Sequence, residues 1–357
     1  MAPSDSSDIL RARFARQPFL MAPMAGVTDA AYRIMCRRRG AETCFTEMVS
    51  VAGIAHGSAK TWVLVEPEPE EPQICVQLFG SKPDQFAAAV VRVQGRLGAK
   101  LTSIDINMAC PARKVVTKGE GSALMDAPDT AERIVSACVR EASVPVTVKI
   151  RSGCRRGERT APAFAEMLEQ AGAAAIAVHG RTADQLYTGT ADWSVVDEVA
   201  RHVSVPVIGS GDVYSAETAA ERFATSGAEA VFIARGTYGN PWIFGDARAL
   251  AFEGAPVPAR GSAERLAALR EHLSLLHATQ PFMARARSFS GWYLKGLPHA
   301  ARWRGRIVRC DSYGEFMGLL DEAEADIAAC EQLLAAGETV PREPEPVGTD
   351  YSHRDAR

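Results

Sequence analysis

Eight short apolar runs recur between residues 19 and 236, and helical patterns separate them. The runs are continuously hydrophobic, which is typical of parallel strands that are buried on both faces. Eight such units within about 230 residues favour a closed barrel over an open doubly wound sheet. We therefore predict an α/β fold, a (β/α)8 TIM barrel. The expected strands cover residues 19–22, 43–49, 74–80, 103–108, 144–150, 174–178, 205–208 and 230–236.

The strand pattern stops beyond Pro256, and only helical patterns follow it. We therefore predict a small all-helical C-terminal domain with helices at 262–279, 284–296 and 312–336. The last residues lack an apolar period, which is typical of a disordered tail. The predicted parts are an N-terminal lead (1–17), the barrel (18–254), a hinge (254–258), the helical domain (259–337) and the tail (338–357).

Hydrogen-bonding residues or close-approach glycines lie at or just after the carboxyl ends of the apolar runs. The carboxyl ends of all strands in a TIM barrel open onto one face, and active sites lie on that face. We therefore expect these residues to line one site. They are Pro23, Met24, Ala25, Glu47, Gln77, Asn107, Cys110, Lys149, His179, Arg181, Ser210, Gly211, Asp212, Ala234, Arg235 and Gly236.

The last two strand ends, at 209–211 and 234–236, indicate a phosphate site because their glycines expose backbone N–H groups. A phosphorylated cofactor is its natural occupant. Lys149 would stabilise a reduced, anionic flavin ring, and Gln77 can both donate to and accept from the ring's pyrimidine edge. The alternative for Lys149 is a salt bridge that closes a strand. His179 follows the next strand, where contact with the ligand is the favoured interpretation.

Cys110 lies in a polar, lysine- and glycine-rich loop directly before Pro111. A thiol is mostly protonated at neutral pH, so Cys110 can donate a proton to a carbon that has accepted a hydride. As a thiolate it could instead attack a substrate, which requires a nearby base. We prefer the acid role.

The eight cysteines show no CxxC pair and no metal-ligand spacing with histidine. We therefore predict no metal site, and this cysteine usage fits a reducing compartment. The first ten residues carry acids where a signal peptide needs bases, and the apolar run at 19–25 is too short to span a membrane. We predict a cytoplasmic monomer.

The charge is unevenly distributed. The whole chain has a net charge of −3, whereas residues 259–310 hold ten Lys or Arg against two acids. Such asymmetry suggests a face that binds a polyanion, although a solvated helical surface explains the charge equally well.

Several motifs resemble those of the tRNA-dihydrouridine synthases, flavoenzymes that reduce uridines in tRNA, and are closest to the bacterial B-type branch. The resemblance covers about residues 19–320. Its motifs are PMAGVTD (23–29), VQLFG (76–80), DINMACPARKV (105–115), VTVKIRSG (146–153), HGRT (179–182), SGD (210–212) and GNPWIF (239–244). The chain departs from the family pattern at three places. Ala109 replaces the usual Gly, Ser210 replaces the commoner Asn, and residues 287–289 replace a basic run.

The resemblance implies that FMN is the resident cofactor, that NADPH reduces it, and that hydride passes from flavin N5 to C6 of a flipped uracil while Cys110 protonates C5. The implied FMN contacts are Pro23, Met24, Ala25, Gln77, Lys149, His179, Ser210, Gly211, Asp212, Ala234 and Arg235. The expected substrate contacts are Asn107, Lys114, Arg181, Arg287 and Lys295.

The predicted partner is therefore tRNA, with residues 292–298 resembling the family's RNA-binding helical region. Two alternatives remain at this point. One is an FMN barrel that acts on a free pyrimidine, as dihydroorotate dehydrogenases do. The other is a non-catalytic RNA-binding protein.

Overall fold

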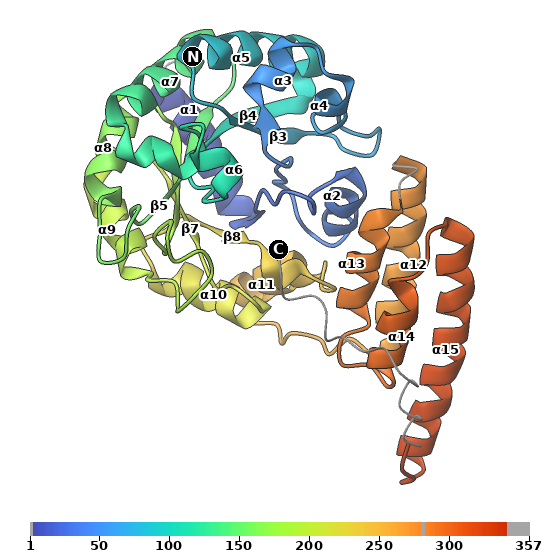
Figure 1. Cartoon of the computed structure of the whole chain (residues 1–357). Coiled ribbons are helices and arrows are strands. Elements are labelled where there is room, and N and C mark those ends of the chain that lie inside the picture. The colour runs from blue at the N-terminus through green and yellow to red at the C-terminus, as the bar shows by residue number, and fades with distance from the viewer. Residues whose placement is uncertain (1–2, 280–282, 341–357) are drawn as a thin grey trace. The chain divides into compact units, whose positions relative to one another are not determined.

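The computed structural model of the chain describes residues 3–279 and 283–340 (Figure 1). These residues form two compact units, and the division between them falls at Ala259 and again within helix α12 (Ser262–Thr279). The first unit holds all the strands of the described residues. The second is entirely helical.

The first unit is built on one parallel sheet whose strands follow the order β1-β8-β7-β6-β5-β4-β3-β2. The sheet curls, so that the first and last strands of the barrel pair with Phe19 opposite Val231. This confirms the predicted α/β, TIM-barrel type of fold. The strands are β1 (Phe19–Met21), β2 (Val49–Ser50), β3 (Ile74–Phe79), β4 (Leu101–Asn107), β5 (Val146–Arg151), β6 (Ala175–His179), β7 (Val207–Ser210) and β8 (Ala230–Ile233).

The second strand position differs from the prediction. Instead of one strand over 43–49, the segment makes isolated bridges and only then forms β2. The N–H of Met21 donates to the carbonyl of Thr43 at 3.0 Å, and the N–H of Thr46 donates to the carbonyl of Cys75 at 2.9 Å. The Thr46 side chain also accepts a hydrogen bond from the N–H of Gln77, which replaces a ladder bond. These contacts connect β1 to β3 and close the ring.

Helices flank the strands, as Figure 1 shows for the outer layer. Local signals set their ends: the Asp29 side chain caps α2 by accepting from the N–H of Tyr32 at 2.9 Å, and prolines begin α5 and α7. The helices are α1 (Pro3–Arg16), α2 (Ala30–Arg37), α3 (Val51–Ala55), α4 (Ala59–Val63), α5 (Pro83–Leu97), α6 (Arg113–Val116), α7 (Pro128–Glu141), α8 (Ala161–Gln170), α9 (Ser194–His202), α10 (Ala216–Thr225) and α11 (Ile243–Glu253), with short 3-10 helices η1 (Gly98–Lys100), η2 (Gly121–Asp126) and η3 (Arg235–Thr237).

The N-terminal lead folds as helix α1, for which the sequence analysis made no prediction. Leu10 and Phe14 are buried in the same cluster as Ile208 and Phe232 of the barrel interior. The Ser7 hydroxyl donates to the carbonyl of Ala174, just before β6, at 3.0 Å. Because Ala174 precedes its strand, α1 covers the amino-terminal end of the barrel and leaves the carboxyl end open.

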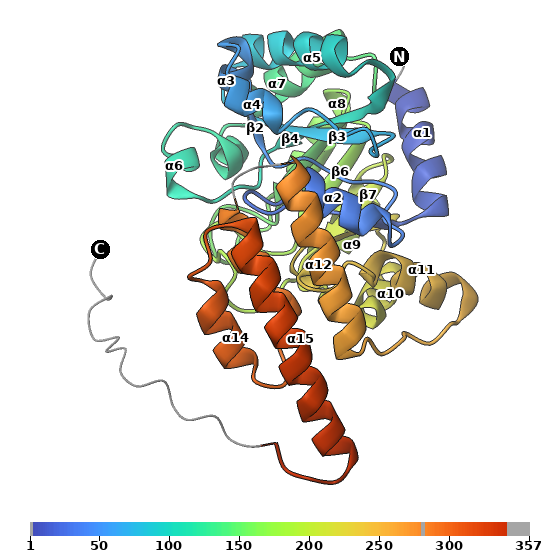
Figure 2. The same cartoon turned by 90° about the vertical axis from the view of Figure 1, so that its right-hand side faces the viewer.

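The second unit comprises the part of α12 up to Leu273, together with α13 (Ala284–Tyr293), α14 (Ala300–Ile307) and α15 (Tyr313–Ala335); Figure 2 labels α12, α14 and α15. Its predicted helices are present, and α14 is an addition that the short, arginine-rich stretch did not indicate. Trp303, Phe289, Tyr293 and Phe316 are fully buried and form its core. Most of the predicted tail, 341–357, lies outside the described residues. None of the helices in the described ranges combines the length and apolarity that a membrane span requires.

Candidate active site

A cavity of about 390 Å³ lies at the carboxyl ends of the barrel strands. It has the size and the mixed lining of a small-molecule site. Residues from seven of the eight strand ends reach it, together with Cys110 of the loop after β4. Its lining includes Pro23, Met24, Ala25, Gln77, Asn107, Cys110, Lys149, His179, Ser210, Gly211, Asp212, Ala234 and Arg235.

The Cys110 loop is held by Asn107, the last residue of β4. The side-chain oxygen of Asn107 accepts hydrogen bonds from the N–H groups of Ala109 and Cys110, at 3.2 and 2.9 Å. Downstream, the N–H of Ser122 donates to the carbonyl of Cys110 at 3.0 Å. The thiol therefore sits on a turn that is fixed from both sides, which keeps it at the cavity wall.

Gly121 packs directly against this turn. Its φ is +61°, and a Cβ placed there would lie 2.6 Å from the carbonyl oxygen of Cys110. Only glycine fits both the backbone conformation and the space. The glycine that follows the loop's lysines thus sets how closely the chain returns to Cys110.

Arg151, at the end of β5, is a site residue that the sequence analysis missed. It is buried and lines the cavity, and its Nε donates to the carbonyl of Ala109 at 2.7 Å. Its Nη1 donates to the carbonyl of Thr182 at 3.0 Å. One guanidinium group therefore connects the Cys110 loop to the loop after β6. Its place at a strand end, two residues after Lys149, was the available signal.

A buried chain of hydrogen bonds fixes the amide of Gln77. Asn107 Nδ2 donates to Gln77 Oε1 at 2.8 Å, and Gln77 Nε2 donates to Asp105 at 2.6 Å. The hydroxyl of Thr147 completes the chain by donating to Asp105 at 2.5 Å. Burial raises the pKa of Asp105 to about 6, against the effect of these two donors and of Lys149. Gln77 keeps one amide hydrogen and one lone pair for a ligand.

Lys149 brings positive charge to the cavity. Burial lowers the pKa of its ammonium group to about 8, Arg151 acts in the same direction, and Asp105 and Cys110 oppose both. Among the described residues its ammonium group has no hydrogen bond or ion pair within bonding distance. The side chain is thus available to an anionic ligand.

His179, at the end of β6, is neutral at physiological pH. Burial lowers its pKa well below 6.5, and the positive charges of Lys149, Arg151, Arg181 and Arg235 lower it further. Nδ1 lies 3.4 Å from the hydroxyl of Ser210, while the buried Nε2 has no partner in the described part of the chain. Such an unpaired buried nitrogen indicates a ligand contact.

Asp212 has its carboxylate turned to protein donors. Arg181 binds it through both terminal nitrogens, at 2.8 and 2.7 Å, and Arg235 approaches to 3.3 Å. The N–H of Ala191 donates a further bond at 2.8 Å. Asp212 and the buried Arg181 thus position Arg235, and Arg181 itself stands behind the cavity wall.

Aromatic residues at the cavity rim are a second feature that the sequence analysis missed. Tyr187 and Tyr214 are exposed, and their ring centroids lie 4.8 and 5.1 Å from the guanidinium carbon of Arg235. Both line the cavity. These contacts restrain the Arg235 head group, as cation–π pairs do. Neither tyrosine directly ends a strand, so the strand-end rule could not find them.

The remaining predicted substrate contacts lie away from the cavity lining. Lys114 is exposed on α6, which begins three residues after Cys110. Arg287 and Lys295 belong to the helical unit. Arg287 Nε donates to the carbonyl of Cys310 at 3.1 Å and its terminal nitrogen pairs with Asp311, whereas Lys295 is exposed.

The helical unit neutralises part of its own basic charge, because acids of α15 pair with several of its arginines. Arg270 approaches Asp321 at 2.6 Å, and Arg306 approaches Glu322 at 2.6 Å. Among the described residues of the helical unit, exposed basic side chains without an ion pair remain at Lys295, Arg304 and Arg309. Tyr293, within the 292–298 stretch that resembles the family's RNA-binding region, is buried in the core of the unit.

Comparison with known proteins gives consistent matches over most of the chain. The model of the family described as dihydrouridine synthase matches residues 20–331. The tRNA-dihydrouridine synthase B of Xanthomonas campestris pv. campestris is 41% identical over 296 residues, which cover 82% of this chain and 88% of that protein. The tRNA-dihydrouridine synthase B of Pseudomonas aeruginosa is 38% identical over 319 residues, which cover 88% of this chain and 92% of that protein.

Proposed function

Because the chain belongs to the dihydrouridine synthase family, we propose that it reduces uridine in tRNA to 5,6-dihydrouridine, with FMN as its cofactor and NADPH as the reductant. The observation that carries the proposal is the position of Cys110. Its thiol-bearing loop borders the same cavity as every residue for which we predicted an FMN contact. A proton donor thus lies beside a site suited to a flavin.

The lining fits FMN in charge and in shape. The phosphate is anionic and the reduced ring carries negative charge, and Lys149, Arg151 and Arg235 supply positive charge around the cavity. The unpaired Nε2 of His179 offers a further polar contact. Gly211 has φ of +133° and no room for a side chain, since a Cβ there would lie 2.5 Å from the Cβ of Ala191.

Different residues of the site would bind different parts of FMN. Ser210, Gly211, Ala234 and Arg235 would hold the phosphate at the ends of β7 and β8. Lys149 and Gln77 would contact the pyrimidine edge of the ring, and Pro23, Met24 and Ala25 would contribute from the end of β1. When bound, the flavin would supply hydride to C6 of the uracil and would regain it from NADPH.

Cys110 then gives its proton to C5 of the uracil, and hydride and proton together saturate the C5–C6 double bond. The thiolate that remains regains a proton from solvent. Asn107 and Arg151 do not react; they hold the loop so that the thiol stays in place, and the neutral His179 adds no competing proton donor.

The substrate has to leave the tRNA stack to enter the cavity. Lys295, Arg304 and Arg309 of the helical unit would contact tRNA phosphates, which makes binding depend on salt. Family membership favours tRNA over a free pyrimidine, because the relatives are named for tRNA. The reaction requires tRNA and a reduced thiol, so we place the activity in the cytoplasm.

The test is mass spectrometry of dihydrouridine in unmodified tRNA after incubation with the protein, FMN and NADPH. We expect product from the wild type and a loss of about 100-fold or more in Cys110→Ala, the usual contribution of a general acid. Cys154→Ala is the matched control, because Cys154 is also a partly exposed thiol in a strand-end loop. It should retain wild-type activity.

Each part of the proposal can fail separately. If the protein oxidises NADPH but forms no dihydrouridine, the flavin site is supported and tRNA is excluded as the substrate. If the purified protein neither carries nor binds FMN, the cofactor assignment is wrong, and a non-catalytic RNA-binding protein is favoured. Equal activity of Cys110→Ala and Cys154→Ala would remove Cys110 as the acid.

A further inference from the structure

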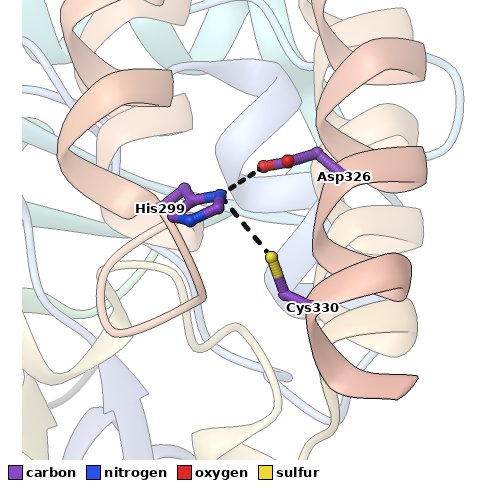
Figure 3. Close-up of side chains that lie close together, drawn as sticks. All are labelled: His299, Asp326 and Cys330. Carbon is purple, nitrogen blue, oxygen red and sulfur yellow. Dashed lines mark hydrogen bonds and ion pairs between the residues drawn. The ribbon is translucent and has the colours of Figure 1, made fainter. Parts of the chain in front are cut away.

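Three metal-ligating side chains converge in the helical unit, outside the cavity of the barrel. Figure 3 shows His299 facing Asp326 and Cys330. His299 Nδ1 lies 2.9 Å from Asp326 Oδ2 and 3.5 Å from Cys330 Sγ. The three donor atoms lie within 4.8 Å of one another. The proposed reduction of uridine uses none of these residues.

Two elements supply the three side chains. Asp326 and Cys330 are four residues apart on α15, so both face the same side of that helix. His299 immediately precedes α14 and has the left-handed backbone conformation, with φ of +51°. The cluster therefore connects the start of the shortest helix of the unit to the longest one.

The spacing of His299 Nδ1 and Cys330 Sγ fits a tetrahedral ion. With zinc bond lengths of about 2.0–2.1 Å to nitrogen and about 2.3 Å to sulfur, tetrahedral geometry places the two donors about 3.6 Å apart. His299 Nδ1 and Cys330 Sγ are 3.5 Å apart. A nitrogen and an oxygen ligand would be about 3.3 Å apart. The 2.9 Å between His299 Nδ1 and Asp326 Oδ2 requires the carboxylate to move by a few tenths of an ångström.

Neighbouring groups orient the Asp326 carboxylate, as hydrogen-bond partners of metal ligands commonly do. The indole nitrogen of the buried Trp303 donates to Asp326 Oδ2 at 2.9 Å and leaves a second lone pair on that oxygen. Arg302 lies 3.8 Å from the other oxygen and is partly exposed.

We propose that His299, Asp326 and Cys330 bind one divalent cation of the zinc class, with water as the fourth ligand. The mixture of imidazole, carboxylate and thiolate suits zinc and excludes magnesium and calcium, which prefer oxygen ligands alone. His299 and Asp326 are 16% and 25% exposed, which leaves space for the water. The ion joins the start of α14 to α15 and stabilises a small helical unit.

The test is a titration of the chelator-treated full chain with Co²⁺ alone. Thiolate coordination gives a near-ultraviolet charge-transfer band, recorded as a difference spectrum so that any flavin cancels. We expect the band to saturate at one Co²⁺ per chain and to disappear when Zn²⁺ is added. The melting temperature of the chain should rise with Zn²⁺.

Variants locate the site. Cys330→Ser and His299→Gln should each weaken Zn²⁺ binding by about 100-fold or more, and Trp303→Phe by about tenfold. Cys310→Ser is the matched control, because Cys310 is another buried thiol of the same unit that lies outside the cluster. It should bind Zn²⁺ as the wild type does. Circular dichroism of the metal-free proteins verifies that each variant is folded.

The proposal is overturned if the wild type shows no sulfur-to-cobalt band, or if Cys330→Ser and Cys310→Ser bind Zn²⁺ equally well. Either result would mean that His299 and Asp326 form an ion pair alone. Formation of dihydrouridine is measured separately, so that loss of the metal site and failure of the proposed reaction remain distinguishable.

Discussion

The guanidinium group of Arg151 donates a hydrogen bond of 2.7 Å to the carbonyl oxygen of Ala109, the residue before Cys110. A second nitrogen of the same group donates to Thr182 in the loop after β6. Strand β5 therefore fixes the position of a thiol that belongs to the loop after β4. This contact makes the geometry of the proposed acid depend on a residue that does not contact the substrate in our scheme.

Replacing Arg151 by Lys tests this contact, because lysine keeps the charge but cannot reach both loops with one rigid fork. We expect dihydrouridine formation to fall by about 10- to 100-fold, since the thiol loses its fixed position. Alkylation of Cys110, followed by peptide mass spectrometry, should become faster. Arg155→Lys, at an exposed arginine that pairs with Asp126 and Glu158, is the control. Identical behaviour of both variants would rule out the positioning role.

Gly121 and Gly119 form a matched pair for the steric requirement of the Cys110 loop. Both have positive φ, but a Cβ would clash with Cys110 at the first and meet nothing within 4 Å at the second. We expect Gly119→Ala to cost about 1 kcal/mol of unfolding free energy from backbone strain alone. Gly121→Ala should cost about 3 kcal/mol, because overpacking adds to the strain. Urea unfolding measures both, and equal costs would show that the clash relaxes freely.

Lys149 should make FMN binding depend on pH. Its ammonium group is charged below its pKa of about 8 and loses its charge above that value. Attraction to an anionic flavin is therefore present at pH 7 and lost as the pH rises, and we expect the dissociation constant for FMN to increase by about tenfold between pH 7 and pH 9. His179 adds nothing in this range, since its pKa lies well below 6.5.

Fluorescence titration of FMN across this pH range measures the effect. Lys149→Met should bind weakly and without the pH dependence. Lys100→Met, at the amino-terminal end of β4, should reproduce the wild-type curve. If Lys149→Met retains the pH dependence, another group is responsible for it.

Lys295 offers the clearest test of tRNA binding by the helical unit. It is exposed, and Lys295→Ala removes a charge without breaking an ion pair among the described residues. We expect weaker tRNA binding and a salt slope reduced by about one. Filter binding at several salt concentrations measures it, with Arg201→Ala on the outer helix α9 as the control. An unchanged salt slope would show that Lys295 does not contact a tRNA phosphate.

Arg287→Ala should also weaken tRNA binding and flatten the salt dependence, as the sequence analysis expects. The structure adds a second effect. Arg287 donates to the carbonyl of Cys310 and pairs with Asp311, so its loss should lower stability as well. Thermal melting alongside the binding assay separates the two effects.

The sequence by itself determined the barrel and most of its cavity. Every strand except the second was predicted from a local apolar run, and a parallel barrel brings all carboxyl ends to one face, so the residues at the ends of the runs meet without further information. Gln77, Lys149, His179 and Arg235 were found in this way. The cap of α2 by Asp29 is equally local, because capping is a contact between near neighbours in the chain.

Only the tertiary structure decided the contacts between segments that are distant in the sequence. The burial of α1 against the barrel, the reach of Arg151 to Ala109 and the pairing of α15 acids with basic side chains all depend on packing. The cluster of His299 with Asp326 and Cys330 is a further case, since 27 residues separate the histidine from the aspartate. Sequence spacing predicted no metal site because the spacing rules describe ligands on one local motif, whereas helix packing joins these three.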